Sequence, residues 1–169
     1  MPQLLVDTNV DPSLLEPLQQ STGLSVAMAP GALDTARELP ESLLADVQAT
    51  LCSFLPTNHA AMKSLKLVQL CSAGFSQVEN LGLAARGVAV CNASGVNDVP
   101  IAEWAITMMV ALARDLPLML RNQQQGLWDR GARFQTEIRG RTLGIWGYGG
   151  IGRETARLAS GMGLRVHVL

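Results

Sequence analysis

The sequence predicts an α/β fold, and three observations support this prediction. Short apolar runs alternate with segments of helical pattern along the chain, which favours parallel β-α-β units over a sandwich or barrel. Runs such as Leu-Val-Gln-Leu-Cys at 67–71 are apolar at consecutive positions, as expected for strands covered by helices on both faces. In addition, one strand leads directly into a glycine-rich turn and a helix, an order typical of nucleotide-binding folds.

The elements expected from this pattern are seven strands and seven helices. Strands are expected at 3–6, 24–28, 51–55, 67–71, 88–91, 142–146 and 164–169. Helices are expected at 12–20, 40–49, 58–64, 78–85, 98–114, 116–125 and 151–161. We find no internal repeat and no low-complexity segment.

The composition is that of a folded protein. Of 169 residues, 48% are hydrophobic and 16% are charged, which argues against disorder. The net charge of −1 gives no reason to expect nucleic acid or an acidic membrane as a partner. The charge is uneven, because residues 1–98 hold 4 Lys/Arg and 9 Asp/Glu, whereas residues 99–169 hold 9 and 5. A basic second part is compatible with an anionic ligand.

The N-terminus, the longest apolar segment and the cysteines predict a soluble, cytoplasmic protein. The N-terminus lacks a signal-peptide pattern, and the longest strongly apolar segment, 101–113, is too short to span a bilayer. The three cysteines lack metal-site spacing, which suggests a reducing compartment and no metal. We interpret Cys52 and Cys91 as core side chains, whereas Cys71 borders a loop.

The helix expected from Asp98 is apolar almost all round. Asn97 or Asp98 can cap it, and Pro100 falls in the tolerated first turn. Its large side chains fall on two sides, with Ile101, Trp104, Ala105, Met108 and Leu112 on one and Ile106, Met109, Val110 and Ala113 on the other. We therefore expect this helix to be buried between domains or between subunits.

The most informative motif is Trp-Gly-Tyr-Gly-Gly-Ile-Gly at 146–152. Gly147 permits a tight turn, Gly149 lets the backbone approach a pyrophosphate, and Gly152 lets the helix pack closely on the strand. A glycine-rich turn without a ligand is the alternative. A P-loop is excluded, because no Gly-Lys-Ser/Thr follows.

The phosphates of a dinucleotide would be held at the start of the following helix. The free N–H groups near Gly150 and Ile151, with the helix dipole behind them, are suited to this role. The residue that reads the ribose is expected about 20 residues beyond the first glycine, just past Leu169.

Three motifs together resemble the D-isomer-specific 2-hydroxyacid dehydrogenases, a family that includes phosphoglycerate dehydrogenase and glyoxylate/hydroxypyruvate reductases. They are LKLVQLCSAGF, continuing to GLAARGVAVCN, then NASGVNDVPIAE, then IRGRTLGIWGYGGIG. The resemblance covers about 67–169, and residues 1–66 fit less distinctly. Two departures are mild, since Ile101 stands where Val is common and Trp146 where a small aliphatic residue is more usual.

The resemblance implies two domains and a dimer. Residues 1–98 would form the N-terminal portion of a flavodoxin-like substrate domain, and residues 99–169 the start of a Rossmann dinucleotide-binding domain. A homodimer would form through the helices at 98–126.

The resemblance also implies the roles of individual residues. The backbone of Ala73 and Gly74 would bind the substrate carboxylate, and Ile101 would lie beside the nicotinamide. Gly150 and Ile151 would hold the pyrophosphate of NAD or NADP.

The family's reaction moves a hydride between nicotinamide and the C2 atom of a small D-2-hydroxy acid or 2-keto acid. Its catalytic His, acidic partner and carboxylate-clamping Arg lie downstream of the glycine turn. We interpret His59 and His167 as structural, and none of the eleven arginines matches the clamp. The catalytic residues are thus expected after Leu169, and the chain is interpreted as an N-terminal fragment of an NAD(P)-dependent oxidoreductase.

Two other interpretations stay open. The chain could be an NAD-binding regulatory module, similar to the corepressors that share this fold, or a nonfunctional remnant of a truncated gene. The sequence does not distinguish NAD from NADP, because the ribose-reading position follows Leu169. It also does not identify the 2-hydroxy acid.

Overall fold

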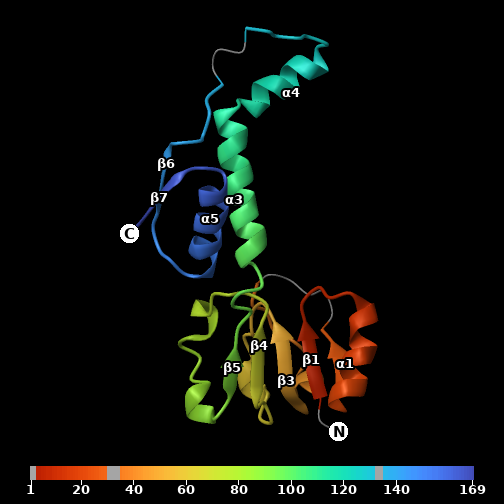
Figure 1. The fold of residues 1–169 in the computed structure, drawn as a ribbon. Coiled ribbons are helices and arrows are strands. Elements are labelled where there is room, and N and C mark those ends of the chain that lie inside the picture. The colour runs from red at the N-terminus through yellow and green to blue at the C-terminus, as the bar shows by residue number, and fades with distance from the viewer. Residues whose placement is uncertain (1–2, 30–34, 132–134) are drawn as a thin grey trace. The chain divides into compact units, whose positions relative to one another are not determined.

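The chain folds into two compact units, residues 1–94 and residues 95–169. The structure is a computed structural model, and it describes residues 3–29, 35–131 and 135–169 (Figure 1). We call these parts unit 1 and unit 2. None of the helices in the described ranges is long and apolar enough to cross a bilayer.

Unit 1 is built on a five-stranded parallel sheet. Its strands are β1 (Gln3–Asp7), β2 (Ser25–Met28), β3 (Val47–Cys52), β4 (Leu67–Leu70) and β5 (Ala89–Cys91). They lie in the order β2-β1-β3-β4-β5, and each neighbouring pair is parallel. This is the strand order of flavodoxin-like folds. The expected fold class is thereby confirmed for this unit.

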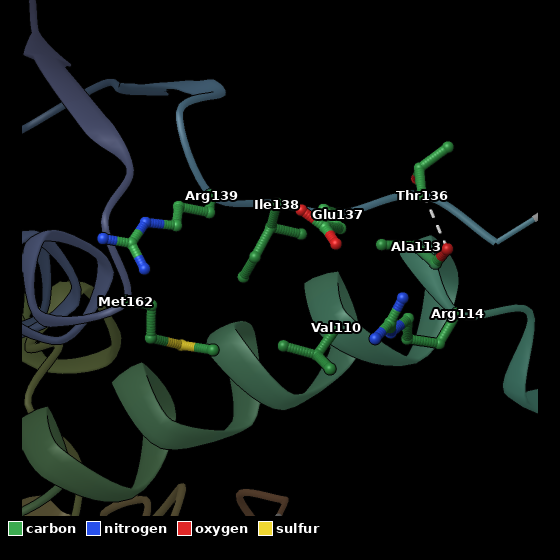
Figure 2. Close-up of a pocket in the computed structure, with 8 residues that line it drawn as sticks. All are labelled: Val110, Ala113, Arg114, Thr136, Glu137, Ile138, Arg139 and Met162. Atoms are coloured by element: carbon green, nitrogen blue, oxygen red, sulfur yellow. Dashed lines mark hydrogen bonds between the residues drawn. The ribbon is translucent and has the colours of Figure 1, made fainter.

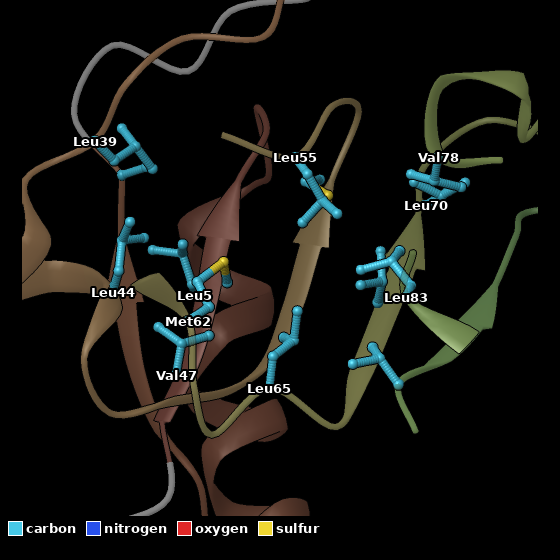
Figure 3. Packing of buried hydrophobic residues seen from close by; sticks show 14 residues of the cluster. Leu5, Leu39, Leu44, Val47, Leu55, Met62, Leu65, Leu70, Val78 and Leu83 are labelled. Carbon is cyan, nitrogen blue, oxygen red and sulfur yellow. The ribbon is translucent and has the colours of Figure 1, made fainter. Parts of the chain in front are cut away.

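The core of unit 1 lies between this sheet and the segments that connect its strands. Figure 3 shows Leu5 and Val47 from the strands packed with Leu44 and Met62 from the connections. All four side chains are fully buried. Met62 is the C-cap of a single 3-10 turn, His59–Ala61, which lies where a longer helix at 58–64 was expected.

The helix expected at 40–49 is confirmed only over Glu41–Leu44 (α2), and the prediction is wrong for 47–49 because the strand expected from residue 51 begins at Val47. β3 is a central strand that pairs with both β1 and β4, so its backbone bonds and buried side chains override the local helical pattern.

The helix expected at 78–85 is absent from unit 1. Two 3-10 turns, Ser76–Val78 and Ala84–Arg86, lie there instead. Gly82 separates them with a φ of +67°, in the left-handed region that ends a right-handed helix. The expected helix at 12–20 is confirmed as a 3-10 turn, Pro12–Leu14, followed by α1 (Leu15–Thr22).

The cysteines divide by their place in the sheet. Cys52 ends the central strand β3 and is fully buried, as expected. Cys91 ends β5, an edge strand whose three residues are all exposed, so the expectation that it packs in the core is wrong. Cys71 follows β4 and is half-buried.

Unit 2 begins with two helices and ends in a β-α-β unit. The helices are α3 (Asp98–Ala113) and α4 (Leu116–Gln124), and the last part is β6 (Thr142–Ile145), α5 (Gly150–Gly161) and β7 (Arg165–Val168). β6 and β7 are parallel, and Leu143 is opposite Val166. The bounds agree with the expected ones to within two residues. α5 packs along α3 (Figure 1).

Helix α3 is not enclosed by unit 2. Ala102 is its only buried residue, although the helix packs on α5. Its exposed large apolar side chains are Val99, Ile101, Trp104, Met108 and Leu112, and the last four follow a helical spacing. We call these four residues the α3 stripe. The rest of unit 2 therefore does not bury α3 in the way that its apolar sequence predicts.

Candidate functional site

The glycine turn joins β6 to α5 and is tied to the end of β7. Gly147 has a φ of +93°, in the region that favours glycine. Its N–H donates to the carbonyl oxygen of Leu169 at 3.1 Å, and the N–H of Leu169 donates to the carbonyl oxygen of Ile145 at 2.9 Å. The chain thus turns sharply at the carboxyl ends of two parallel strands, the place where open α/β sheets bind ligands.

Gly149 and Gly152 lack a side chain for two different physical reasons. A Cβ added at Gly152 would overlap the carbonyl oxygen of Gly147 and lie 3.4 Å from Cγ2 of Ile145, so glycine permits close packing of helix on strand. A Cβ added at Gly149 would meet no atom within 4 Å, and φ there is −74°. Glycine at 149 is therefore not required by the fold, and it leaves open space beside the backbone.

The start of α5 presents unpaired backbone donors to this open space. The first N–H groups of any α-helix have no partner inside the helix, and here they belong to residues from Gly150 onward. The N-cap, Gly149, provides no side-chain hydrogen bond, and the first turn of α5 contains no acidic residue. The positive end of the helix dipole is thus free of any anion from α5 itself.

These backbone groups line a cleft of about 550 Å³ within unit 2. Its lining includes all five glycine-turn residues expected at the site, Gly147, Gly149, Gly150, Ile151 and Gly152. Ile101, expected beside them, is not part of the lining and is 42% exposed in the α3 stripe. The cleft is large enough for part of a dinucleotide, and the open backbone at Gly149 fits a phosphate group.

The α3 helix contributes a residue to the cleft that sequence reasoning missed. Asp98, which starts α3, lines the cleft and places its carboxylate against the Cα of Gly150. The sequence marks Asp98 only as a residue able to begin a helix. Nothing in the local pattern connects it with a turn about 50 positions later.

The candidate substrate loop lies in unit 1, directly after β4. Three side-chain and backbone donors hold its successive carbonyl oxygens. The N–H of Ala93 donates to the carbonyl of Ser72 at 3.0 Å, and Asn92 Nδ2 donates to that of Ala73 at 2.8 Å. Ser72 Oγ donates to the carbonyl of Gly74 at 2.8 Å. In the part of the chain that the structure describes, the N–H groups of Ala73 and Gly74 have no acceptor.

The side chain of Gln77 links this loop to Ser53, the residue that follows β3. Gln77 Nε2 donates to Ser72 Oγ at 2.9 Å and to the carbonyl oxygen of Ser53 at 3.2 Å. A hollow of about 390 Å³ adjoins the loop, lined by Ser53, Phe54, Ser72, Gly74, Ser76 and Gln77. The loop therefore offers free amide donors, neutral hydroxyl groups and a fixed backbone, a set suited to a small carboxylate.

The two histidines lie in regular elements. His59 begins a 3-10 turn, its ring nitrogen Nδ1 is 3.5 Å from Nη1 of Arg86, and burial followed by the Arg86 charge lowers its pKa. His167 lies within β7, opposite Gly144 of β6. Neither residue lines the glycine-turn cleft or the hollow beside the candidate substrate loop.

A second hollow lies at the far end of α3, and no sequence motif predicts it. It measures about 410 Å³ and is lined by Val110, Ala113, Arg114, Thr136, Glu137, Ile138, Arg139 and Met162 (Figure 2). The N–H of Thr136 donates to the carbonyl oxygen of Ala113 at 2.7 Å and fixes the returning chain to the helix end. Glu137 lines the hollow together with Arg114 and Arg139, so its lining carries one acidic and two basic side chains.

Comparison with known proteins assigns unit 2 to a described domain type. Residues 106–169 match the family model described as "D-isomer specific 2-hydroxyacid dehydrogenase, NAD binding domain". That match contains β6, the glycine turn, α5 and β7. It begins within α3, after Asp98 and Ile101.

Relatives are found for nearly the whole chain. D-3-phosphoglycerate dehydrogenase of Rattus norvegicus is 30% identical over 172 residues, covering 96% of this chain and 31% of the relative. Hydroxypyruvate reductase of Thermotoga maritima is 30% identical over 106 residues, covering 63% of this chain and 35% of the relative. The chain thus spans about a third of the length of these curated relatives.

A solved structure with the same fold extends over both units. The NADPH-dependent glyoxylate/hydroxypyruvate reductase of Sinorhizobium meliloti, in complex with citrate, has a TM-score of 0.79 and 28% identity. The alignment covers 99% of this chain and 54% of that protein. The same reductase was also solved with NADP and malonate, with a TM-score of 0.77.

Proposed function

Because this chain belongs to the D-isomer-specific 2-hydroxyacid dehydrogenase family, we propose that it forms the dinucleotide turn and the substrate loop of an NAD(P)-dependent oxidoreductase. The reaction is hydride transfer between nicotinamide and the C2 atom of a small D-2-hydroxy acid or 2-keto acid. The observation that carries this proposal is the open backbone at Gly149, which faces a cleft lined by the glycine turn.

In this proposal unit 2 binds NAD or NADP through its backbone. The N–H groups at Gly150 and Ile151 hold the pyrophosphate, and Gly147 and Gly152 keep strand and helix close enough to present them. Ile101 faces the nicotinamide. Because Ile101 does not line the cleft, the nicotinamide would lie outside the cleft lining described above. The bound nucleotide supplies the hydride, and this chain's residues supply binding and orientation.

Unit 1 contributes the carboxylate site. The N–H groups of Ala73 and Gly74 donate to the substrate carboxylate, and Asn92 and Gln77 hold the loop in place. Backbone donors suit this role, since they carry no charge that changes with pH. The residues that exchange the hydroxyl proton are proposed to come from outside these 169 residues, because His59 and His167 are both held in regular elements.

We also propose a homodimer formed through the helices at 98–126 and a cytoplasmic location. The support for the dimer is the α3 stripe, in which Trp104 is 64% exposed and Leu112 is 76% exposed. Exposed apolar groups arranged along one helix favour association with a second copy. The support for a reducing compartment is that Cys52, Cys71 and Cys91 are all free thiols.

Nucleotide binding by the 169-residue chain tests the central proposal. NADH and NADPH are titrated while tryptophan fluorescence is recorded, because Trp146 lines the cleft and is 93% exposed. Gly149→Val is expected to abolish binding while leaving the fold intact, since its side chain would project into open space. Gly161→Val is the control, because it makes the same change in open space at the other end of α5.

Two results would contradict the proposal. One is unchanged nucleotide affinity in a folded Gly149→Val variant, and the other is equal loss of binding in both variants. The reaction is tested separately with the native protein, by nicotinamide absorbance in the presence of glyoxylate or hydroxypyruvate. Loss of absorbance supports the oxidoreductase, whereas binding without turnover of any 2-keto acid favours a regulatory module.

The dimer is tested by sedimentation velocity. Leu112→Glu is expected to shift the wild-type dimer to a monomer, because it places a charge within the α3 stripe. Leu14→Glu is the control, since Leu14 is a similarly exposed leucine in unit 1. A monomeric wild-type chain, or a dimer that persists in Leu112→Glu, would rule out this interface.

A further inference from the structure

The carboxylate of Asp98, at the start of α3, lies against Gly150 in the glycine turn. A Cβ added at Gly150 would overlap the Asp98 carboxylate, and both of its oxygens lie within 3 Å of that position. The carboxylate therefore occupies the space that a side chain at position 150 would fill. Asp98 is half-buried and lines the same cleft as Gly147 and Gly149.

The position of this carboxylate has an electrostatic consequence. α5 starts at Gly150 and has neither a capping side chain nor an acidic residue in its first turn. A carboxylate beside the first turn of a helix is attracted by the positive end of the dipole. Asp98 therefore supplies from α3 the anion that α5 lacks. A phosphate bound at the glycine turn would meet the same positive pole and, a few ångströms away, the same negative charge.

We propose that Asp98 tunes the affinity of the dinucleotide site, because its carboxylate stabilises the free glycine turn and weakens phosphate binding to it. The inference rests on the proposed function, since it assumes that the turn holds a pyrophosphate. Asp98 acts through charge and through contact with Gly150, and it takes no part in the hydride transfer.

This role predicts opposite effects on stability and on affinity. Asp98→Asn keeps the shape of the side chain but removes the charge, so the free chain should unfold at a lower temperature. The same variant should bind NADH about three- to tenfold more tightly at low salt, from the size of a screened charge-charge interaction. The gain should shrink to less than about twofold in 1 M NaCl, where the Debye length is about 3 Å.

A merely structural role would give a different result. If Asp98 only supported the start of α3, its loss would weaken the fold and the binding together. Glu103→Gln is the matched control, because it removes one carboxylate from the exposed face of the same helix, outside the cleft. It should leave NADH affinity within about twofold of the wild type, as expected for a screened, more distant charge.

The packing itself is tested without any nucleotide by a double-mutant cycle. Gly150→Ala should give little of the roughly 4–8 °C rise that the helix propensity of alanine would bring, because the Asp98 carboxylate must first rotate out of the overlap. In an Asp98→Ala background the same change should give that rise in full, because the overlapping carboxylate is gone. The transition is followed by tryptophan fluorescence, since Trp104, Trp128 and Trp146 all lie in unit 2.

The outcomes separate this inference from the proposed function. Tighter, salt-sensitive NADH binding by Asp98→Asn together with a non-additive cycle supports it. Equal or weaker binding by Asp98→Asn, with Gly149→Val still defective, overturns the inference and leaves the proposed function standing. No NADH binding by the wild-type chain overturns both. An additive cycle shows that Asp98 and Gly150 are not in contact and also overturns the inference.

Discussion

The carbonyl oxygen of Gly147 lies against the Cα of Gly152, so the first and last glycines of the turn are in direct contact. This contact sets how closely α5 approaches β6. Because the obstructing atom belongs to the backbone of the turn, it cannot rotate away as a flexible side chain would. An added side chain at position 152 would therefore displace the backbone of the turn.

We predict that Gly152→Ala destabilises unit 2. The added methyl group forces the turn apart, at a cost of about 1–3 kcal/mol in the free energy of unfolding. Urea denaturation followed by tryptophan fluorescence measures this, since all three tryptophans lie in unit 2. Gly161→Ala, in open space on the same helix, should instead raise the stability by about 0.5–1 kcal/mol. If both substitutions changed the free energy of unfolding equally, the close contact between Gly147 and Gly152 would be ruled out.

A second prediction concerns the ion pair between Asp7 and Arg37. The Asp7 carboxylate, only 3% exposed at the end of β1, accepts hydrogen bonds of 2.8 and 3.2 Å from the guanidinium. Asp7→Ala removes both hydrogen bonds between the buried carboxylate and Arg37 and should destabilise unit 1 by about 1–3 kcal/mol. Hydrogen-deuterium exchange of peptides from β1 and β3 measures the loss.

The control for this prediction is an exposed ion pair. Glu154 and Arg157 pair on the surface of α5, and their hydrogen bond lowers the pKa of Glu154. Glu154→Gln should leave the exchange of α5 peptides unchanged, because exposed pairs contribute little to stability. Faster exchange of α5 peptides in Glu154→Gln, or unchanged exchange of β1 and β3 peptides in Asp7→Ala, would contradict this prediction.

A third prediction is that the cysteines differ in reactivity. Burial raises the pKa of the Cys52 thiol to about 12, whereas Cys91 is exposed. At pH 8, a thiol reagent such as DTNB should therefore label Cys91 within the mixing time and Cys52 only when unit 1 opens. Peptide mass spectrometry assigns the labelled sites. Prompt labelling of Cys52 in the folded chain would contradict the buried assignment.

The same thiol predicts a pH dependence of stability. In the unfolded chain Cys52 ionises near its ordinary pKa of 9.0, but in the folded chain only near pH 12. Its contribution is fully present below pH 9, and it is lost as pH rises toward 12, at up to about 1.4 kcal/mol per pH unit. Exchange of β3 peptides between pH 8 and 10 should show this slope, and Cys52→Ala should reduce it.

A fourth prediction concerns the candidate substrate loop. Asn92→Ala removes the 2.8 Å hydrogen bond to the carbonyl oxygen of Ala73, worth about 0.5–1.5 kcal/mol. KM for a 2-keto acid should then rise about three- to tenfold in the native protein, because the loop that carries the proposed carboxylate donors is less firmly held. Asn80→Ala, at an exposed position of the same unit, is the control and should leave KM unchanged. An unchanged KM in Asn92→Ala would show that Asn92 does not hold the loop for substrate binding.

Some of the architecture could be predicted because its causes are local. A strand that runs into Gly147 and a helix is recognisable from neighbouring residues, and Gly147 does adopt a φ of +93°. Gly152 is needed for a contact with a residue only five positions away. The predicted bounds of α3, 98–114, agree with the observed ones to within one residue, because its cap and its apolar pattern lie in one continuous segment.

Other features depend on contacts between distant parts of the chain. Residues 47–49 were expected at the end of a helix, but they begin strand β3 because β1 and β4 bond this strand on both sides. Cys91 is exposed because β5 is at the edge of the sheet, and strand order cannot be read from periodicity.

The sequence by itself determined the α/β class, the glycine turn and the segments that form unit 2, because backbone geometry and apolar period are properties of adjacent residues. Only the tertiary structure decided that Asp98 meets Gly150 and that the α3 stripe stays exposed within unit 2. Those relationships join residues that are far apart in the chain or depend on what covers a helix. They follow from packing, in which the free energy of burial overrides local preference.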